Sequence, residues 1–236
     1  MVSEEQESEF FMIDTSTVEI SDTKFRRLNQ YYVTPIIRIQ ESTLNFNRGS
    51  FSDFNKTLFF LEGGNYFFDT LHISRGRMTW YENVEPYMVN SIVFDVSAAD
   101  LSITNGIFDG IFSNFSSPII YIENDAAATD KHQLILKNSS FTNNVANETA
   151  GVILSVNTNM TIDRCRFENN TALLKDAGAL YLDCQDSSTS PCQYTISNSI
   201  FKNNSALIDG GAIKYDYYPP NISNNNTFIS NKATYG

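Results

Sequence analysis

The sequence of 236 residues predicts an all-β fold, a right-handed parallel β-helix of about eight coils. Three observations predict this fold class. An apolar strand pattern recurs along the whole chain, a polar residue followed by a small one recurs at a fixed offset, and a second apolar run follows in most copies. Regular recurrence of this kind is typical of a solenoid, in which each repeat stacks on the previous one.

The repeat is defined by one large apolar anchor in each copy. The copies are clearest toward the C-terminus, as in Tyr194 to Ala206 (YTISNSIFKNNSA). Alignment of all copies gives anchors at Phe25, Phe51, Met78, Phe108, Phe141, Phe167, Phe201 and Phe228. The uneven spacing of these anchors indicates loops inserted into a regular scaffold.

A short strand precedes each anchor. Apolar residues stand seven and five positions before it, and this alternation predicts a strand because successive side chains point to opposite faces. The pairs are Val18 and Ile20, Leu44 and Phe46, Leu71 and Ile73, Leu101 and Ile103, Leu134 and Leu136, Met160 and Ile162, and Tyr194 and Ile196. In the last copy Ile222 is slipped by one residue from this pattern.

A corner separates this strand from the anchor. A polar residue, often Asn, stands three positions before the anchor, and in most copies a small residue follows it. Asn tolerates left-handed backbone angles and bonds its own main chain, so pairs such as Asn198-Ser199 predict a bend. The polar corner residues are Asp22, Arg48, Arg75, Asn105, Asn138, Arg164, Asn198 and Asn225.

A second strand follows the anchor in most copies. The apolar runs cover residues 35–39, 58–61, 91–96, 118–122, 151–156, 178–182 and 211–215. Stacked coils would superimpose like residues at about 4.8 Å. We therefore expect a core that includes Ile103, Phe108, Leu136, Phe141, Ile162, Phe167, Ile196 and Phe201. A leucine-rich repeat is the alternative architecture, but its single strand and helical return fit these two β-rich runs poorly.

The domain organisation is expected to be simple. Residues 1–15 are predicted to be an acidic, disordered segment, and residues 16–236 to be the β-helix, truncated in the last repeat. The N-terminus has neither the basic nor the apolar region of a signal peptide, and no apolar run is long enough to span a bilayer. Because an array that ends inside a repeat would expose an apolar end and unpaired strand edges, we expect a fragment of a longer protein, anchored to a membrane through a region outside this chain.

Charge and cysteine content restrict the partners and the compartment. The net charge of −11 and the scattered Lys and Arg argue against nucleic acid, and no cofactor is expected. Cys184 and Cys192 flank a polar loop and are candidates for a disulfide, although three free thiols are the alternative. Sequons for glycosylation occur at Asn55, Asn114, Asn138, Asn147, Asn159, Asn169, Asn203, Asn221 and Asn225.

Two short motifs carry a resemblance to a known family. The run Tyr194 to Ile213 contains Phe-x-x-Asn and Gly-Gly-Ala-Ile, and Phe141 to Asn144 and Phe167 to Asn170 repeat the first motif. In this the chain resembles the polymorphic outer membrane protein repeat, over roughly its C-terminal hundred residues. It is also similar to large surface proteins of ciliates. The resemblance implies a right-handed β-helix of the pectin lyase-like kind, outside the cell, in which the repeats are scaffold.

Aspartates in matching positions are the best candidates for a site. Asp176 and Asp209 precede the Gly-Ala motif and Asp183 and Asp216 follow it, so each pair is expected to stack on adjacent coils. Such carboxylates could bind Ca²⁺, above all at Asp176 and Asp209, or act in a retaining glycosidase. Solvated loop acids are the simpler interpretation.

Other polar and aromatic residues have weaker claims to a function. Motifs expected of polygalacturonases are missing, and His72 and His132 lack a catalytic context. Arg75-Gly76-Arg77 could contact an anionic sugar, but a solvated corner is the simpler interpretation. Trp80-Tyr81 and Tyr215 to Tyr218 are expected to be exposed, because they fall in loops.

The sequence therefore favours a non-catalytic, extracellular scaffold for display or adhesion. Its expected partners are the remainder of a longer surface protein and, outside it, glycans or surface molecules of a host or neighbouring cell. An extracellular polysaccharide lyase or glycoside hydrolase of the pectin lyase-like fold is the alternative. A pocket that joined Asp176, Asp209 and a basic residue would favour that alternative.

Overall fold

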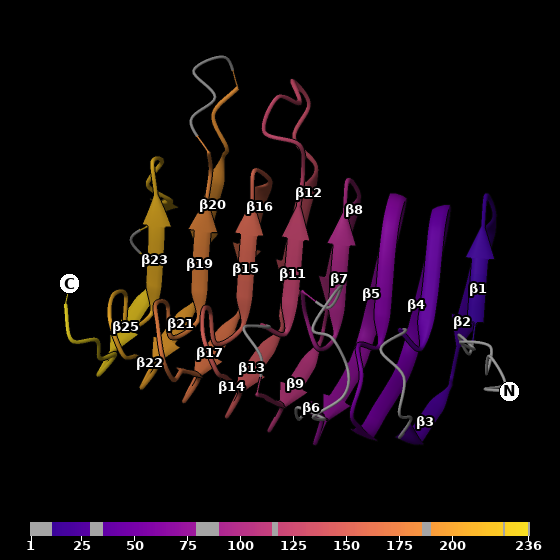
Figure 1. Cartoon of the computed structure of the whole chain (residues 1–236), viewed down its shortest axis with the longest axis horizontal. Coiled ribbons are helices and arrows are strands. Elements are labelled where there is room, and N and C mark those ends of the chain that lie inside the picture. The colour runs from indigo at the N-terminus through magenta and orange to yellow at the C-terminus, as the bar shows by residue number, and fades with distance from the viewer. Residues whose placement is uncertain are drawn as a thin grey trace, which may run out of the picture.

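The computed structural model describes residues 11–28, 35–78, 90–114, 118–185, 190–223 and 225–235. These residues form 25 strands and no helix. The strands stack in parallel as coils along one axis, so the molecule is an all-β parallel β-helix, as predicted (Figure 1). Since the described residues include no helix, they include none able to cross a membrane.

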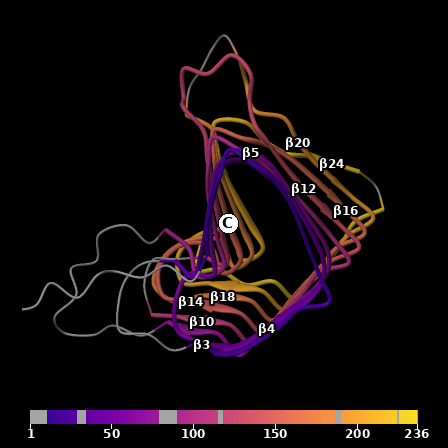
Figure 2. The same cartoon turned by 90° about the vertical axis from the view of Figure 1, so that its right-hand side faces the viewer.

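Each coil contributes to three faces of one large sheet (Figure 2). The later coils add a short fourth strand, which belongs to a small separate sheet. The first face consists of β1 (Phe11–Asp14), β7 (Phe94–Ser97), β11 (Ile120–Glu123), β15 (Ile153–Val156), β19 (Leu180–Asp183) and β23 (Ile213–Asp216). The second face consists of β2 (Thr17–Ser21), β8 (Asp100–Thr104), β12 (Gln133–Lys137), β16 (Asn159–Asp163), β20 (Tyr194–Ser197) and β24 (Asn221–Ile222).

The third face carries the anchor residues. It consists of β3 (Lys24–Leu28), β9 (Ile107–Asp109), β13 (Ser140–Thr142), β17 (Arg166–Glu168), β21 (Ile200–Lys202) and β25 (Thr227–Ile229). The long strands β4 (Ile37–Phe54) and β5 (Phe59–Ser74) run through all three faces. The small separate sheet consists of β6 (Arg77–Met78), β10 (Phe112–Ser113), β14 (Val145–Ala146), β18 (Thr171–Ala172) and β22 (Ser205–Ala206).

The register of the coils confirms the predicted stacking. Ile162 pairs with Ile196, and Phe141 pairs with Phe167, as equivalent residues of adjacent coils. The anchors of successive coils pair in order from Phe25 to Phe228, which gives eight coils. All eight predicted core residues are fully buried.

The third coil is the exception, because its predicted register is wrong by five residues. Ile73, and not Met78, pairs with Phe51 on one side and Phe108 on the other. Met78 instead pairs with Ser113 in the small sheet. The segment fits the apolar pattern twice, once ending at Ile73 and once at Met78, and Gly76 favoured the wrong match. The true coil is shorter, with its corner at Thr70.

The corners of the coil are held in the left-handed backbone conformation, and two of them flank the anchor strand. The first has φ values from 50° to 55° and consists of Asp22, Arg48, Thr70, Asn105, Asn138, Arg164 and Asn198. The second follows the anchor and consists of Arg27, Asp53, Arg75, Gly110, Asn143, Asn169, Asn203 and Ser230. Arg75, predicted for the first corner, therefore belongs to the second. Asn recurs at these corners because it tolerates this conformation better than most residues.

The Phe-x-x-Asn motif joins two interior ladders. The rings of Phe141, Phe167 and Phe201 stack at 5.0 and 4.8 Å with an interplanar angle of 5°. Asn170, three residues after Phe167, is fully buried. Its Nδ2 donates to Asn204 Oδ1 at 2.9 Å and to the Phe141 carbonyl at 2.9 Å. Its Oδ1 accepts bonds from the backbone and side-chain nitrogens of Asn144. Every hydrogen-bonding position of this amide is therefore used between coils.

The Gly-Ala motif has a different role, which is to allow two coils to approach. A Cβ on Gly178 would lie 2.2 Å from the Gly211 carbonyl oxygen, and a Cβ on Gly151 would lie 2.2 Å from that of Gly178. Only glycine fits here, because no Cβ can approach a backbone atom so closely. The preceding residue is left-handed, with φ of 63° at Ala177 and 64° at Gly210.

The β-helix begins earlier than predicted. Residues 11–14, which fall in the segment predicted to be disordered, form β1 and pair with β4 from Phe11–Ile37 to Asp14–Gln40. The reason is visible in the sequence, since Phe-Met-Ile continues the apolar pattern of the first face. Residues 1–10 lie outside the described residues.

Candidate functional site

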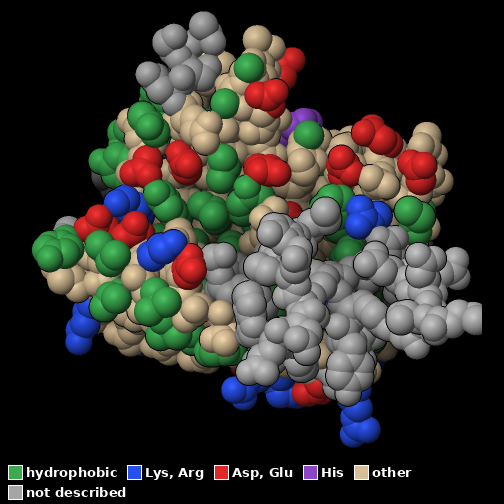
Figure 3. Space-filling view, viewed as in Figure 1, with side chains coloured by type: hydrophobic (Ala, Val, Ile, Leu, Met, Phe, Trp, Pro, Cys, Tyr) green, Lys and Arg blue, Asp and Glu red, His purple; other side chains and the backbone are tan. Residues whose placement is uncertain are grey.

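The outward side of the first face gathers acidic and tyrosine side chains. Figure 3 shows acidic side chains spread across this side, with hydrophobic ones between them. One row of aligned residues is Arg38, Phe60, Asp95, Tyr121, Leu154, Tyr181 and Lys214. The row beside it is Gln40, Glu62, Ser97, Glu123, Val156, Asp183 and Asp216. We call these two rows the tyrosine–acid face.

Two tyrosines of this face bind carboxylates. The Tyr121 hydroxyl donates to Glu123 Oε2 at 2.5 Å, and the Tyr181 hydroxyl donates to Asp216 Oδ2 at 2.5 Å. Burial and the adjacent acids raise the pKa of both phenols, so both stay protonated donors at neutral pH. Tyr121, Tyr181 and Glu123 were not predicted as site residues. In the sequence, these residues differ from their neighbours only in being polar side chains at outward positions of apolar strands, which does not indicate a site.

Asp183 and Asp216 do lie on adjacent coils, where their Cα atoms are register partners. Burial, and to a lesser extent the charge of Asp216, raises the pKa of Asp183. Two carboxylates on adjacent strands could provide an acid and a nucleophile for sugar chemistry. Asp216 accepts the hydrogen bond from the Tyr181 hydroxyl, so the environments of the two carboxylates differ.

Asp176 and Asp209 also meet, but a lysine joins them. Lys214 Nζ lies 2.9 Å from Asp209 Oδ2 and 3.9 Å from Asp176 Oδ2. The backbone nitrogen of Asp209 donates to Asp176 Oδ1 at 3.0 Å. Hydrogen bonding to Asp209 raises the pKa of Lys214, so the lysine stays charged. The result is an ion triad on the structure's surface.

The triad fits the predicted calcium site poorly. Ca²⁺ takes six to eight oxygen ligands, and here an ammonium group already lies between the two carboxylates. Within the described ranges, no group of three or more His, Cys, Asp or Glu residues is placed to hold a metal. A hollow of about 580 Å³ opens beside β23, lined by residues that include Gly211, Tyr215 and Phe228, but it does not include either aspartate.

Asp95 is a buried acid that sequence reasoning missed. It is 3% exposed, and its Oδ2 accepts a hydrogen bond from the backbone nitrogen of Asn90 at 3.1 Å. Burial raises its pKa to about 6. It lies within the run 91–96, which reads as a continuous apolar strand, so its position gave no signal of function.

The histidines and Arg75 are placed as surface groups. His72 is exposed, and His132 Nδ1 lies 3.2 Å from Asp100 Oδ1. Arg75 Nε lies 2.7 Å from Asp53 Oδ1. The guanidinium is therefore already paired within the protein and is not free for an anionic sugar. Arg77 lies over the Phe112 ring, 5.4 Å from its centroid.

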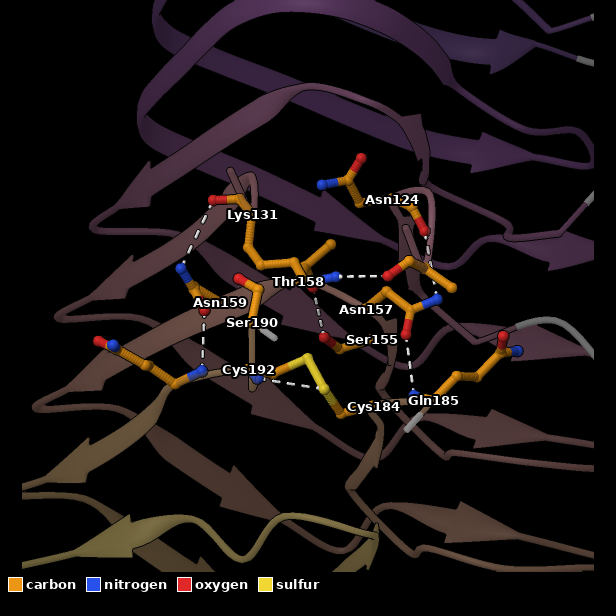
Figure 4. The surroundings of a disulfide bond; sticks show 12 residues. Asn124, Lys131, Ser155, Asn157, Thr158, Asn159, Cys184, Gln185, Ser190 and Cys192 are labelled. Atoms are coloured by element: carbon orange, nitrogen blue, oxygen red, sulfur yellow. Dashed lines mark hydrogen bonds between the residues drawn. A yellow bond between two sulfur atoms is a disulfide. The ribbon is translucent and has the colours of Figure 1, made fainter. Parts of the chain in front are cut away.

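Cys184 and Cys192 are joined by a disulfide across the connection between β19 and β20. The loop between β11 and β12 projects from the edge of the β-helix at which this disulfide lies (Figures 1 and 2). Ser190 Oγ donates to the Thr129 carbonyl at 2.9 Å, which links the two loops. Between them the short turn at Asn157 is held on both sides, through Gln185 and Asn124 (Figure 4).

The sequon asparagines fall into two groups. The exposed ones are Asn114, Asn138, Asn169, Asn203, Asn221 and Asn225, and the partly buried ones are Asn55, Asn147 and Asn159. Asn159 is occupied at both ends of its amide, by the Lys131 carbonyl at 3.5 Å and the Gln193 backbone nitrogen at 2.8 Å. A glycan on Asn159 would break this link between the loops.

The predicted exposed aromatics are partly described. Tyr215 is 48% exposed and Tyr217 is 66% exposed. Tyr218 is partly buried and packs against the core. Trp80 and Tyr81 lie outside the described residues.

Comparison with known proteins bears on the repeat alone. No curated protein matches the chain. Residues 198–214 match the model of the Chlamydia polymorphic membrane protein repeat. The matched stretch contains the stacked Phe201, the ladder residue Asn204 and the close-approach Gly211 described above. The chain thus carries a repeat of the polymorphic outer membrane protein type, built into a parallel β-helix.

Proposed function

We propose that the chain is a non-catalytic, surface-displayed scaffold that presents its outward side chains to partners. The observation that carries this proposal is the use of the repeat motif. The groups that define it, the Phe ring, the Asn amide and the Gly backbone, are all used inside the β-helix in contacts between coils. The matched family is a repeat of membrane proteins and not an enzyme family.

The outward residues support the same function. Aligned outward positions differ from coil to coil, as Tyr121, Leu154 and Tyr181 show, whereas aligned inward positions such as Ile162 and Ile196 repeat. A rigid interior with a variable exterior is suited to display. The disulfide and the exposed sequons are consistent with an extracellular location.

Surface display is tested on cells that make the full-length protein. An antibody against this chain should label intact cells, and protease added outside should remove the signal. Labelling that requires permeabilised cells would refute the proposal. An antibody against a cytoplasmic protein of the same cells controls for membrane integrity.

A carbohydrate-active enzyme is the second candidate, and one observation favours it. Asp183 and Asp216 lie on adjacent coils in different environments, near the ion triad of Asp176, Asp209 and Lys214. If the chain is a carbohydrate-active enzyme, the purified chain releases reducing or unsaturated ends from acidic polysaccharides, and Asp183→Asn abolishes this release. Equal release by parent and variant would instead indicate a contaminant.

A further inference from the structure

We propose that a cationic surface on the N-terminal coil binds sulfated polysaccharide. The surface consists of Lys24, Arg26 and Arg27, which we call the basic patch. The proposal names a class of partner for the scaffold, and it rests on the proposed function for the assumption that the patch faces the extracellular medium. The binding itself is a property of the chain and can be measured without that assumption.

Strand geometry places the three cations together. Lys24 and Arg26 flank Phe25 on β3, and Phe25 points inward to stack on Phe51 at 4.7 Å. Because alternate residues of a strand share a face, Lys24 and Arg26 both point outward, with Cα atoms about 7 Å apart. Arg27 follows at the left-handed corner with φ of 58°. All three side chains are exposed.

Among the described residues, the acids near the patch are held by other cations, and the charge of Arg27 acts on one of them, Asp53. In the described part of the chain, none of the three cations of the patch forms an ion pair. The acids closest to it along the corners are already paired, Asp22 with Arg48 at 2.7 Å and Asp53 with Arg75 at 2.7 Å. Figure 3 shows Lys and Arg side chains projecting from the lower edge of the molecule, where Figure 1 places β3 and β6.

Several cations on the later coils are placed differently. Arg166 and Lys202 share Glu168, and Arg164 pairs with Asp163 at 2.9 Å. These cations are therefore neutralised within the protein, and they provide a matched comparison for the patch. The three cations of the patch, which form no ion pair among the described residues, are available to an external anion although the net charge of the chain is −11.

The surroundings of the patch suit a sulfated sugar better than a lipid or a nucleic acid. On the next two coils Lys24 aligns with Ser50 and His72, and Arg26 aligns with Ser52 and Ser74. Hydroxyl and imidazole groups can bind sulfate and sugar hydroxyls. No aromatic platform for bases and no apolar side chain for membrane insertion occurs in these aligned positions.

The overall negative charge does not prevent this binding at physiological salt. The Debye length is then about 8 Å, less than the thickness of two coils at about 4.8 Å each. The acids of the C-terminal coils are therefore screened from the patch, while a sulfate in contact with it is not.

The test is to measure binding of the purified chain to heparin at about 0.15 M salt, where the Debye length is about 8 Å. We expect Lys24→Ser/Arg26→Ser/Arg27→Ser to weaken binding about tenfold or more, because three exposed charge contacts are lost. The control is Arg164→Ser/Arg166→Ser/Lys202→Ser, which removes the same charge from neutralised positions and should change binding by less than about threefold. Circular dichroism should show that both variants are folded.

Three results would overturn the proposal. These are no binding of heparin by the parent, equal loss in both triple variants, or binding of phosphatidylserine vesicles or a single-stranded oligonucleotide as tight as that of heparin. Chemically desulfated heparin should not bind. Failure of heparin binding leaves the surface-labelling experiment unaffected, so the two proposals fail separately.

Discussion

Single residues of the repeat have roles that their positions define. Asn170 is the clearest case, since its amide bonds to the coil before it and the coil after it. Gly178 is needed for the opposite reason, because its missing side chain leaves room for the Gly211 carbonyl. The residues of the short repeat motif therefore make, or leave room for, the contacts between adjacent coils.

Removal of the Asn170 amide should be costly. Asn170→Ala leaves the backbone N–H of Asn144 and one of its two side-chain N–H groups without an acceptor in a buried site, and we expect a loss of about 2 to 4 kcal/mol in the free energy of unfolding. Urea denaturation measures this loss. Thr195→Ala, on the exposed outer side of β20, is the control and should change stability by less than about 0.5 kcal/mol.

The two glycine positions should respond in opposite ways. Gly178→Ala brings a Cβ against the Gly211 oxygen and should lower the melting temperature strongly. Gly110→Asn should be tolerated, because a Cβ there meets nothing within 4 Å and Asn143, Asn169 and Asn203 hold the same corner. A Gly178→Ala variant as stable as the parent would contradict the close approach of the two coils.

Ionisation of Asp95 should make stability depend on pH. Its pKa is raised from 3.8 to about 6 in the folded protein, so folding is favoured while the group is protonated and this contribution is lost as the pH rises from about 4 through 6. Asp95→Asn should therefore be more stable than the parent at pH 7, by about 2 kcal/mol, with no gain at pH 4. Melting curves of both proteins at the two pH values provide the comparison. A gain that is equal at both pH values would show that ionisation is not the cause.

At the scale of the element, the strands depend on their neighbours in adjacent coils. The phenyl stack from Phe108 to Phe228 has ring separations of 4.6 to 5.0 Å. A strand of three residues such as β17 has little stability alone, so the ring that it contributes to the stack holds it in place.

Loss of one ring should therefore unfold more than one strand. Phe167→Ala removes an interior ring between two stacked partners and should cost about 3 to 5 kcal/mol. The exposed neighbour Ile200→Ala, 36% exposed, should cost far less. A melting temperature of Phe167→Ala equal to that of the parent would contradict the assignment of this ring to the core.

The disulfide closes the connection between β19 and β20. Closing a loop with a sequence separation of 8 should contribute about 2 to 3 kcal/mol through the entropy of the unfolded chain. Cys184→Ser/Cys192→Ser should lose this amount in chemical denaturation. Cys165→Ser should be neutral, because Ser139 and Ser199 hold the equivalent corners and bond in the same way, each to the carbonyl two residues before it.

The sequence predicted the strands and corners well and the outer face poorly. Inward positions such as Ile162 and Ile196 repeat, so their alignment fixes the register of the coils. The third coil shows the limit, since an apolar pattern that fits twice, at Ile73 and at Met78, does not reveal which fit brings adjacent strands together. Outward residues such as Tyr121 and Asp95 are not repeated, and only the folded coils bring them into one row.

For the whole molecule, distance along the axis separates two kinds of surface. The basic patch belongs to the first coil, whereas Asp183 and Asp216 belong to two of the last. Because the coils are rigidly stacked, these surfaces keep a fixed separation. One chain can therefore present a cationic and an anionic region at once. The charged residues are scattered along the sequence, so this separation is not apparent there.

The long connections from β11 to β12 and from β19 to β20 have a consequence for how such proteins diversify. Both insertions leave the registers on either side unchanged, since Leu134 still pairs with Met160 and Met160 with Tyr194. Evolution can thus lengthen, shorten or rewrite a protrusion in one coil while the spine of the solenoid persists.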